Sequence, residues 1–337
     1  MEAYTVTGRI GEGAHGVVVK AKHILTGRPV ALKKIPLRRL DQGMPATALR
    51  EIKALQQIQS EYVVQLLDVF ADGTGFVLAF ELMPGDLGEM IRDATRPLTE
   101  AQAKTYMVML IKGVAFLHQN NIMHRDLKPA NLLINEYGRL KIADFGLCRI
   151  FSKKRKRLYS HQVATRWYRA PELLYGARQY TEGVDIWAAG CIFGELINKS
   201  PIFPGDSDIN QLFVVLQVLG TPSEANWPGL SQLPDYKKIT FPEAKPVPLE
   251  KVLPDASSVA LDLLKRLLVY HAAHRLSAQR ALQHEYFWTA PLPAPLSEMP
   301  RPHPDKLPPP ASREYPTHLD WHAMMRPAHQ LLATLQP

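Results

Sequence analysis

Three glycines followed directly by three valines constrain the N-terminal fold of this chain more than any other feature. The stretch IGEGAHGVVVKAKH (residues 10–23) has the spacing G-x-G-x-x-G, which is a weak signal by itself. A dinucleotide-binding turn places such glycines between a strand and a helix, whose N-terminus holds the pyrophosphate. Here the glycines precede VVVKAK, and consecutive β-branched residues favour a second strand. We therefore expect a β-hairpin whose backbone amides can approach phosphate groups, and the dinucleotide-binding fold is excluded.

Length and charge limit the class of protein without selecting its partner. At about 150 residues per domain, the 337 residues predict two domains. The 40 Lys and Arg exceed the 32 Asp and Glu, so the formal net charge is +8. A positive balance suits an acidic partner such as a nucleotide, a nucleic acid or a phosphorylated protein, and it does not choose among them.

The cysteines and the apolar segments predict a soluble, intracellular protein. Cys148 and Cys191 are far apart in the sequence, which excludes a disulfide framework and favours a reducing compartment. The first residues, MEAYTVTGRI, carry no apolar signal region. The apolar stretch DIWAAGCIFGELI (185–197) is shorter than the roughly 20 residues that cross a bilayer, so we expect a buried helix and no membrane insertion.

The hydrophobic pattern changes along the chain from strands to helices. Strands are expected within 4–35 and over 76–83, and helices over 46–58 and 102–120. Proline crowds residues 289–317, so we expect a packed core to stop there. This order predicts a small β-rich lobe, a larger helical lobe and an extended tail.

A lysine and a glutamate are predicted to form one buried ion pair. In PVALKK, strand alternation places Ala31 and Lys33 on the same face. A buried ammonium is costly unless it is paired with an anion. Glu51 lies three residues after Ala48 and four before Leu55, beside the apolar stripe of the expected helix. Two unrelated surface charges are the alternative for any single Lys and Glu.

The stretch HRDLKPANLL (124–133) carries the most specific chemistry. Asp126 can accept or orient a hydroxyl proton, Lys128 can neutralise a transferring phosphoryl group, and Asn131 can hold a metal ion. In DFGLCR, which follows, Asp144 can bridge Mg²⁺ to phosphates. DFG alone would indicate only a turn.

The glycine loop, VALK, HRDLKPAN, DFG and APE, in this order and spacing, resemble the protein kinases over residues 4–288. The resemblance implies an α+β, two-lobed kinase fold with a small β-rich N-lobe that carries one key helix and a larger, mainly helical C-lobe. The implied divisions are an N-lobe over about 4–80, a hinge at 81–86, a C-lobe over 87–288 and a proline-rich tail over 289–337.

The resemblance also implies the roles of individual residues, with ATP and Mg²⁺ as cofactors. Catalytic roles fall to Asp126, Lys128, Lys33, Glu51 and Thr165, and metal ligation to Asn131 and Asp144. Asp185 would brace the catalytic loop, and Glu172 would pair with Arg275. The implied nucleotide contacts are Ile10, Gly11, Glu12, Gly13, Ala14, His15, Gly16, Val17, Val18, Ala31, Lys33, Phe80, Glu81, Met83, Asp86, Lys128, Asn131, Leu133 and Asp144.

Further motifs resemble the group that contains the cyclin-dependent and mitogen-activated kinases. VATRWYRAPELL (163–174) and LGTPSEANWPGLSQLPDYKK (219–238) are typical of that group, and Arg169 would shape a pocket favouring proline after the target Ser or Thr. Gln162 stands where mitogen-activated kinases carry a tyrosine, which disfavours that subfamily. PATALRE (45–51) is similar to the cyclin-facing helix of the cyclin-dependent kinases.

Within that family, the chain is most similar to the cell-cycle-related branch. This resemblance implies a cyclin or cyclin-like activator, substrates with Ser-Pro or Thr-Pro, a role in cell-cycle or ciliary signalling, and a location in nucleus, cytoplasm or cilium. We expect no nucleic-acid partner. The alternatives are a catalytically silent pseudokinase scaffold, which would lack one of Lys33, Asp126, Asn131 or Asp144, and a small-molecule kinase, which the APE segment disfavours.

Two departures from the family concern regulation. Ala14 and His15 replace an inhibitory Thr-Tyr pair of many relatives, so we expect no inhibition by phosphorylation there. Ser160 stands where the family presents an activating threonine, and an upstream kinase would phosphorylate it. Arg50, Arg125 and Arg149 match the arginines that surround that phosphate, and without it their charges would repel and leave the loop poorly ordered.

A basic run, SKKRKR (152–157), lies inside the same segment. A solvated loop is the favoured interpretation. Docking of an acidic partner or nuclear import is the alternative.

Overall fold

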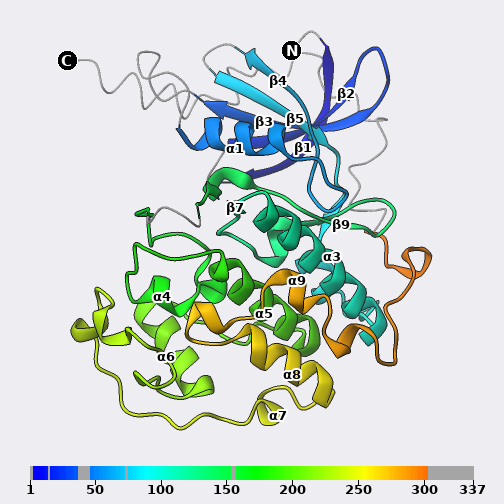
Figure 1. Cartoon of the computed structure of the whole chain (residues 1–337). Helices are drawn as coiled ribbons and strands as arrows, with labels where there is room; N and C mark the ends of the chain where they lie inside the picture. The colour runs from blue at the N-terminus through cyan, green and yellow to red at the C-terminus, as the bar shows by residue number, and fades with distance from the viewer. Residues whose placement is uncertain (1–2, 14–15, 37–45, 73–74, 153–156, 303–337) are drawn as a thin grey trace, which may run out of the picture. The chain divides into compact units, whose positions relative to one another are not determined.

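The chain forms two compact units (Figure 1). The computed structural model describes residues 3–13, 16–36, 46–72, 75–152 and 157–302. Of these, unit 1 contains the residues up to 36 and 66–82, and unit 2 contains 46–65 and 83–302. A β-rich unit and a mainly helical unit confirm the expected α+β class. The helix over 46–57, expected in the β-rich lobe, groups with the helical unit.

Unit 1 is one antiparallel sheet with the strand order β1-β2-β3-β5-β4. Gly13 pairs with Gly16 where β1 meets β2, so the glycine stretch forms the expected hairpin. Residues 14 and 15 lie outside the described residues. The strands are β1 (Tyr4–Gly13), β2 (Gly16–His23), β3 (Pro29–Pro36), β4 (Leu66–Asp72) and β5 (Gly75–Glu81).

One face of this sheet forms the core of unit 1. Side chains alternate between the two faces of a strand, so every second residue of β2, β3 and β5 points into the core. The Tyr4 ring stacks on Phe70 at 5.5 Å between centroids and closes one side. The buried members are Tyr4, Val19, Ala21, Val30, Leu32, Val77 and Ala79.

Unit 2 is built mainly from helices, and its longest one is well capped. The Thr99 hydroxyl accepts from the Gln102 backbone N–H, and the Gln102 side chain accepts from the Thr99 N–H. This capping box satisfies two amides that the first turn leaves open. The helices are α1 (Ala46–Gln57), α2 (Leu87–Arg92), α3 (Glu100–Gln119), α4 (Pro171–Leu174), α5 (Gly183–Asn198), α6 (Asp208–Leu219), α7 (Leu249–Val252), α8 (Ser258–Leu267) and α9 (Ala278–Ala281).

The apolar stretch expected to form a buried helix is α5, in which Trp187 and Phe193 are fully buried. The predicted helices over 46–58 and 102–120 are likewise confirmed as α1 and α3. Among the described residues, none of the helices combines the length and apolarity needed to span a membrane.

Short strands in unit 2 hold the loops that carry polar residues. β6 (Gly85–Asp86), β8 (Leu132–Ile134) and β9 (Leu140–Ile142) form one sheet in the order β6-β8-β9. β7 (Ile122–Met123) pairs with β10 (Arg149–Ile150). Both pairings bring residues near 124–131 close to residues near 144 in space.

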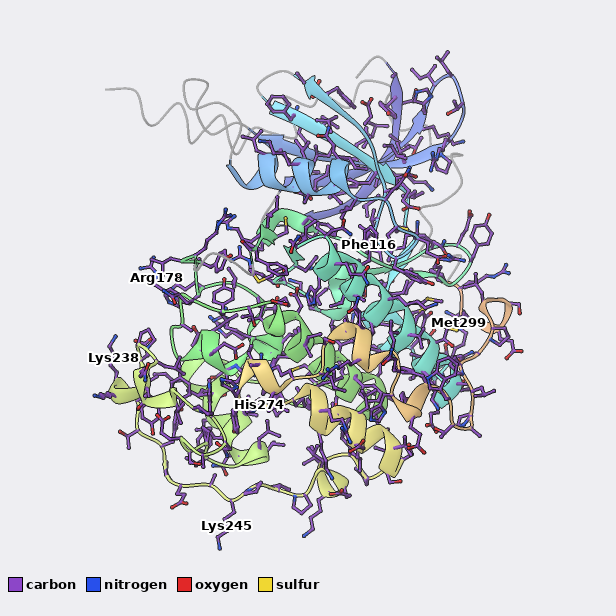
Figure 2. The ribbon with its side chains drawn as sticks, in the orientation of Figure 1. Phe116, Arg178, Lys238, Lys245, His274 and Met299 are labelled. Carbon is purple, nitrogen blue, oxygen red and sulfur yellow. The ribbon has the colours of Figure 1, made fainter. Side chains whose placement is uncertain are left out.

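The structure differs from the sequence at the proline-rich segment. Packing was expected to stop near residue 289, but residues 289–302, here named the strap, pack along the first turns of α3. The strap is the part of the orange ribbon that follows α9 in Figure 1. Ala294 and Met299 of the strap are buried (Figure 2 labels Met299). Proline-rich composition does not prevent packing here, because the strap is held through its carbonyl groups, which proline retains.

Candidate active site

The face of the unit 1 sheet opposite its core carries the expected nucleotide-binding side chains. Val18 lies opposite Lys33 in the β2–β3 pair, and Ala31 lies opposite Phe80 in the β3–β5 pair. Since Ala31 and Lys33 are two residues apart on β3, all four share that face. Val17 does not belong with them, because its side chain packs against the core cluster.

Other predicted nucleotide contacts of unit 1 lie on its strands. Ile10 is exposed on β1, and Glu81 ends β5. Lys33 is buried on β3, Glu51 is buried on α1 of unit 2, and their pairing stays a prediction. Gly11, Gly13 and Gly16 belong to the hairpin strands, as does the backbone of Glu12.

Asp126 is buried at the centre of a hydrogen-bonded group in unit 2. Its Oδ1 accepts from the Thr165 backbone N–H at 2.9 Å and from the Thr165 hydroxyl at 3.2 Å. Its Oδ2 accepts from Asn131 Nδ2 at 3.0 Å and lies 3.2 Å from Lys128 Nζ. Lys128 Nζ also donates to the Thr165 hydroxyl at 2.9 Å. The structure thus brings four of the predicted catalytic and metal-binding residues together.

Asp185, on α5, holds the backbone of the loop that carries Asp126. Its Oδ2 accepts from the His124 N–H at 2.9 Å, and its Oδ1 accepts from the Arg125 N–H at 2.8 Å. His118 Nε2 lies 2.9 Å from the same Oδ2. Burial would raise the pKa of Asp185, but the His118 hydrogen bond and charge and the Arg125 N–H lower it overall. The predicted bracing of the loop by Asp185 is confirmed.

The hydrogen bonds to Asp185 stabilise an unfavourable backbone conformation at Arg125. Its backbone φ is +69°, in the left-handed region that a residue with a Cβ rarely adopts. Such a conformation costs about 1–3 kcal/mol and persists only when the surroundings fix it. The two amide hydrogen bonds to Asp185 supply that restraint.

His124 connects the Asp126 loop to the DFG segment. Its Nδ1 accepts from the Asp126 N–H at 3.2 Å, and its Nε2 lies 2.9 Å from the Ala143 carbonyl oxygen. Because a carbonyl can only accept, Nε2 carries the hydrogen in this contact. The Ala143 N–H in turn donates to the Asn131 carbonyl at 2.9 Å. The segments of Asn131 and Asp144 are therefore fixed to each other.

Asn131 and Asp144 fit a divalent metal by the chemistry of their donors. Asn131 Nδ2 donates to both the carbonyl oxygen of Asp126, at 2.8 Å, and its Oδ2, at 3.0 Å. These bonds fix the amide and leave its Oδ1 as the acceptor. Amide and carboxylate oxygens are ligands that Mg²⁺ and similar hard cations prefer. Asp144 has φ +62°, a strained conformation that is frequent at functional sites.

Met83, Asp86 and Leu133 belong to unit 2. Met83 is buried, and Asp86 pairs with Leu133 across β6 and β8. The Asp86 carboxylate also caps α2 by accepting from the Glu89 N–H at 3.0 Å. Burial raises the pKa of Asp86 despite that hydrogen bond.

Glu172 of the APE segment forms the predicted pair with Arg275. Arg275 Nη1 and Nη2 donate to the two carboxylate oxygens of Glu172, each at 2.7 Å. Arg275 also donates to the carbonyls of Gly183 and Tyr270. This buried, bidentate pair ties the APE motif (170–172) to the helical core.

Arg125 reaches toward Ser160 through a tyrosine. The Arg125 guanidinium donates to the Leu147 carbonyl and, at 2.7 Å, to the Tyr180 hydroxyl. That hydroxyl donates to the Ser160 carbonyl at 2.6 Å. Ser160 is exposed, and Tyr180 links its carbonyl to the hydrogen-bonded Arg125 guanidinium.

Two other arginines were expected near a phosphate on Ser160. Arg149 lies on β10, and the side chain of Arg50 lies outside the described part of the chain, as do residues 153–156 of the basic run. The convergence of the three arginines stays a prediction.

Arg169 holds the backbone just before the APE segment. Its Nε donates to the Val163 carbonyl and its Nη2 to the Ala164 carbonyl, each at 2.8 Å. Its Nη1 bonds Asp208 Oδ1 at 2.8 Å. Ala164 has φ +67°, so its peptide is turned relative to an extended chain.

The sequence did not single out His118, Tyr180, Ala164 or Asp208. The need of Asp185 for a buried donor could have directed attention to His118, which stands in the last turn of α3. The other three act through contacts between residues distant in sequence or through a backbone angle, and neither leaves a local pattern.

Comparisons with known proteins agree with this geometry. Residues 4–287 match the protein kinase domain family. The chain is 66% identical over 303 residues to cyclin-dependent kinase 20 of Danio rerio, covering 90% of this chain and 88% of that protein. It is 60% identical over 333 residues to cyclin-dependent kinase 20 of Homo sapiens, covering 98% and 96%.

More distant relatives share the same domain. Cyclin-dependent kinase D-1 of Oryza sativa subsp. indica is 48% identical over 295 residues, 88% of this chain and 69% of that protein. The crystal structure of the yeast RNA Pol II CTD kinase CTDK-1 complex contains a chain that superposes with a TM-score of 0.81 at 35% identity, covering 88% of this chain and 96% of that one. A serine/threonine protein kinase domain implies ATP, a divalent metal and protein substrates, and this chain belongs to the cyclin-dependent kinase family of protein kinases.

Proposed function

We propose that this kinase transfers the γ-phosphate of Mg-ATP to Ser or Thr followed by Pro. The observation that carries the proline preference is the turned peptide of Ala164, whose carbonyl accepts from Arg169 at 2.8 Å. Val163 has its carbonyl on the same guanidinium. The carbonyl groups of Val163 and Ala164 therefore both face Arg169 and do not offer an acceptor to the N–H of a bound substrate.

This arrangement discriminates against residues that carry a backbone N–H. A substrate residue whose N–H loses water and finds no acceptor costs about 1–3 kcal/mol. Proline has no N–H and avoids that cost. The pocket therefore selects proline because every other residue would bind with a backbone N–H that has no acceptor.

Four residues of unit 2 divide the transfer chemistry among them. Asp126 Oδ1 and Oδ2 can orient the substrate hydroxyl and accept its proton. Lys128 Nζ, 2.9 Å from the Thr165 hydroxyl, can neutralise the transferring phosphoryl group. Asn131 and Asp144 would hold Mg²⁺, which neutralises phosphate charge when bound.

We also propose activation through phosphorylation of Ser160 by an upstream kinase and through a cyclin or cyclin-like partner. A phosphate on exposed Ser160 would meet Arg125, whose Nη1 already reaches the Ser160 carbonyl through Tyr180. A phosphoserine carries about −1.5 to −2 charge and makes strong hydrogen bonds to guanidinium groups. The names of the relatives support a cyclin partner.

The cellular role is proposed to lie in cell-cycle or ciliary signalling, in the nucleus, the cytoplasm or the cilium. The pseudokinase scaffold is the second candidate. It is disfavoured because Lys33, Asp126, Asn131 and Asp144 are all present.

The test is phosphate transfer to matched Ser-Pro and Ser-Ala peptides by the chain phosphorylated at Ser160. We expect transfer to Ser-Pro, with Ser-Ala reduced by a factor of about 10 or more, as one unpaired N–H implies. Arg169→Leu should reduce that discrimination, because it releases both carbonyls. Equal transfer to the two peptides by the unmodified pocket would contradict the proline preference, and Ser160→Ala with full activity would contradict the phosphorylation switch.

A further inference from the structure

The strap ends against the strand that carries a predicted nucleotide contact. A Cβ placed on Gly85 would lie 3.0 Å from the Pro302 Cβ and 3.2 Å from its Cγ, so the Pro302 ring packs closely on the Gly85 backbone. Gly85 and Asp86 make up β6. We propose that Pro302 is a positioning residue for ATP binding, because it fixes β6 and thereby Asp86; this inference rests on the proposed function.

Beyond the hydrogen bond by which Asp86 caps α2, β6 has little support of its own. It is two residues long, and within the described chain it lies at the edge of its sheet, paired to β8 through Gly85 with Ile134 and Asp86 with Leu133. So short an edge strand contributes few hydrogen bonds and is marginal without further packing. The buried proline ring supplies packing on Gly85.

The strap also packs against the turn that follows β8. Gly138 lies in the turn between β8 and β9, with φ +82°. A Cβ on Gly138 would lie 2.7 Å from the Met299 Cβ, and Met299 is only 3% exposed. Met299 therefore contacts the β8–β9 turn, and Pro302 contacts β6. The strap thus packs beside both β6, which holds Asp86, and the end of β8, which holds Leu133.

The strap is itself held in place along its length. The Ala294 N–H donates to the Ala101 carbonyl at 3.1 Å, and the Thr105 hydroxyl donates to the Ala294 carbonyl at 2.9 Å. Further bonds come from Gln102 to the Glu298 carbonyl, Tyr106 to the Pro300 carbonyl and Arg96 to the Arg301 carbonyl. Since Arg301 is anchored, the adjacent Pro302 cannot shift freely away from Gly85.

Such coupling has to act in both directions. If the strap improves nucleotide affinity, bound nucleotide must stabilise the strap by the same factor. The Ala294 amide, hydrogen-bonded to α3, reports on the strap, and its hydrogen exchange should slow when ADP binds.

The experiment compares Pro302→Gly with Pro295→Gly in the full chain. Pro295 is an exposed proline of the same strap, so its variant has a matched change in backbone freedom. We expect Pro302→Gly to raise the Kd for ADP and the KM for ATP by about fivefold, with kcat changed less than twofold. Pro295→Gly should leave all three unchanged, and ADP should protect the Ala294 amide less in Pro302→Gly than in the original chain.

A second pair of variants tests the contact itself. Gly85→Ala should also raise the Kd for ADP. In the double variant with Pro302→Gly, the rise should be smaller than the two single effects combined, because the proline atoms that the new Cβ would meet are gone. Equal Kd and KM in Pro302→Gly and Pro295→Gly, in a chain that is otherwise active, would overturn the inference alone. Failure of the original chain to bind ADP at all would overturn the proposed function with it.

Discussion

The catalytic loop over 124–131 and the strap are both irregular segments, and the side-chain hydrogen bonds that anchor each of them to a neighbouring helix run in opposite directions. In the loop, backbone N–H groups donate to one buried carboxylate, that of Asp185. In the strap, backbone carbonyls accept from side chains of α3, among them Lys104 and Thr105. Prolines remove N–H donors and keep carbonyls, so a proline-rich segment is best held in the second way.

This difference indicates how strongly each segment should depend on any single side chain. The loop depends on a single anion that receives hydrogen bonds from several groups, so its loss should be severe. The strap spreads its hydrogen bonds over several side chains, so the loss of any one should cost less. The following predictions test this ranking, from the largest expected effect to the smallest.

Replacing Asp185 by Asn should have the largest effect. The variant removes the buried charge that receives His118 and two backbone amides, and it turns an NH₂ group toward donors. Breaking such a buried pair costs about 3–5 kcal/mol of unfolding free energy. Urea unfolding with a kcat measurement checks this, and Asp255→Asn, at an exposed carboxylate, is the control. Equal stability of the two variants would show that the loop does not depend on one anion.

Replacing Lys104 by Met should have an intermediate effect. Lys104 is 1% exposed, its Nζ donates to the carbonyls of Thr289 and Pro291, and it lies 4.4 Å from the Tyr286 ring centroid. Burial lowers the pKa of Lys104. Met keeps the volume but leaves the carbonyls without this donor, at about 1–3 kcal/mol.

Thermal unfolding together with hydrogen exchange at the Ala294 amide measures the Lys104 effect. Lys112→Met, at an exposed lysine of the same helix, should change neither quantity. A loss at Lys104 as large as that at Asp185 would remove the distinction between the two segments.

Glu195 extends the comparison to a third buried anchor, because it is a buried carboxylate that accepts from the Tyr168 hydroxyl at 2.6 Å. Burial raises the pKa of Glu195, although the Tyr168 hydrogen bond opposes the shift. A raised pKa in the folded state contributes stability below the ordinary value of about 4.3, and that contribution is lost as pH rises through the raised pKa.

Glu195→Gln should therefore flatten the dependence of unfolding free energy on pH above about 4, by less than roughly 1.5 kcal/mol, the size of one net hydrogen bond. Unfolding at a series of pH values measures it, with Glu243→Gln at an exposed site as the control. An unchanged pH profile would mean that Glu195 is ionised in the folded chain as easily as in the unfolded one.

The sequence predicts those parts of the fold and site that local patterns encode. Hydrophobic periodicity located α1 and α3, and the valines after the glycines identified the hairpin of β1 and β2. The spacing of Asp126, Lys128 and Asn131 predicted a group that the structure brings together within hydrogen-bonding distance.

The parts that escaped prediction depend on contacts between distant residues. The proline-rich composition of the strap predicts an open tail, because composition does not indicate that Lys104 and Thr105 donate hydrogen bonds to its backbone carbonyls. The link from Arg125 through Tyr180 to Ser160 joins three segments and has no sequence signature. The side chain of Val17 points to the core because of strand alternation, which the resemblance alone did not consider.

The most direct test of the central claim is a single-turnover measurement of phosphate transfer by Asp126→Asn, with ADP affinity measured on the same protein. Asn keeps the shape of Asp126 and its contact with the Thr165 N–H but cannot take a proton. We predict a transfer rate lower by about 10²–10⁴ with ADP affinity unchanged. Transfer at the rate of the original chain would contradict the assignment of Asp126 as the residue that accepts the substrate proton.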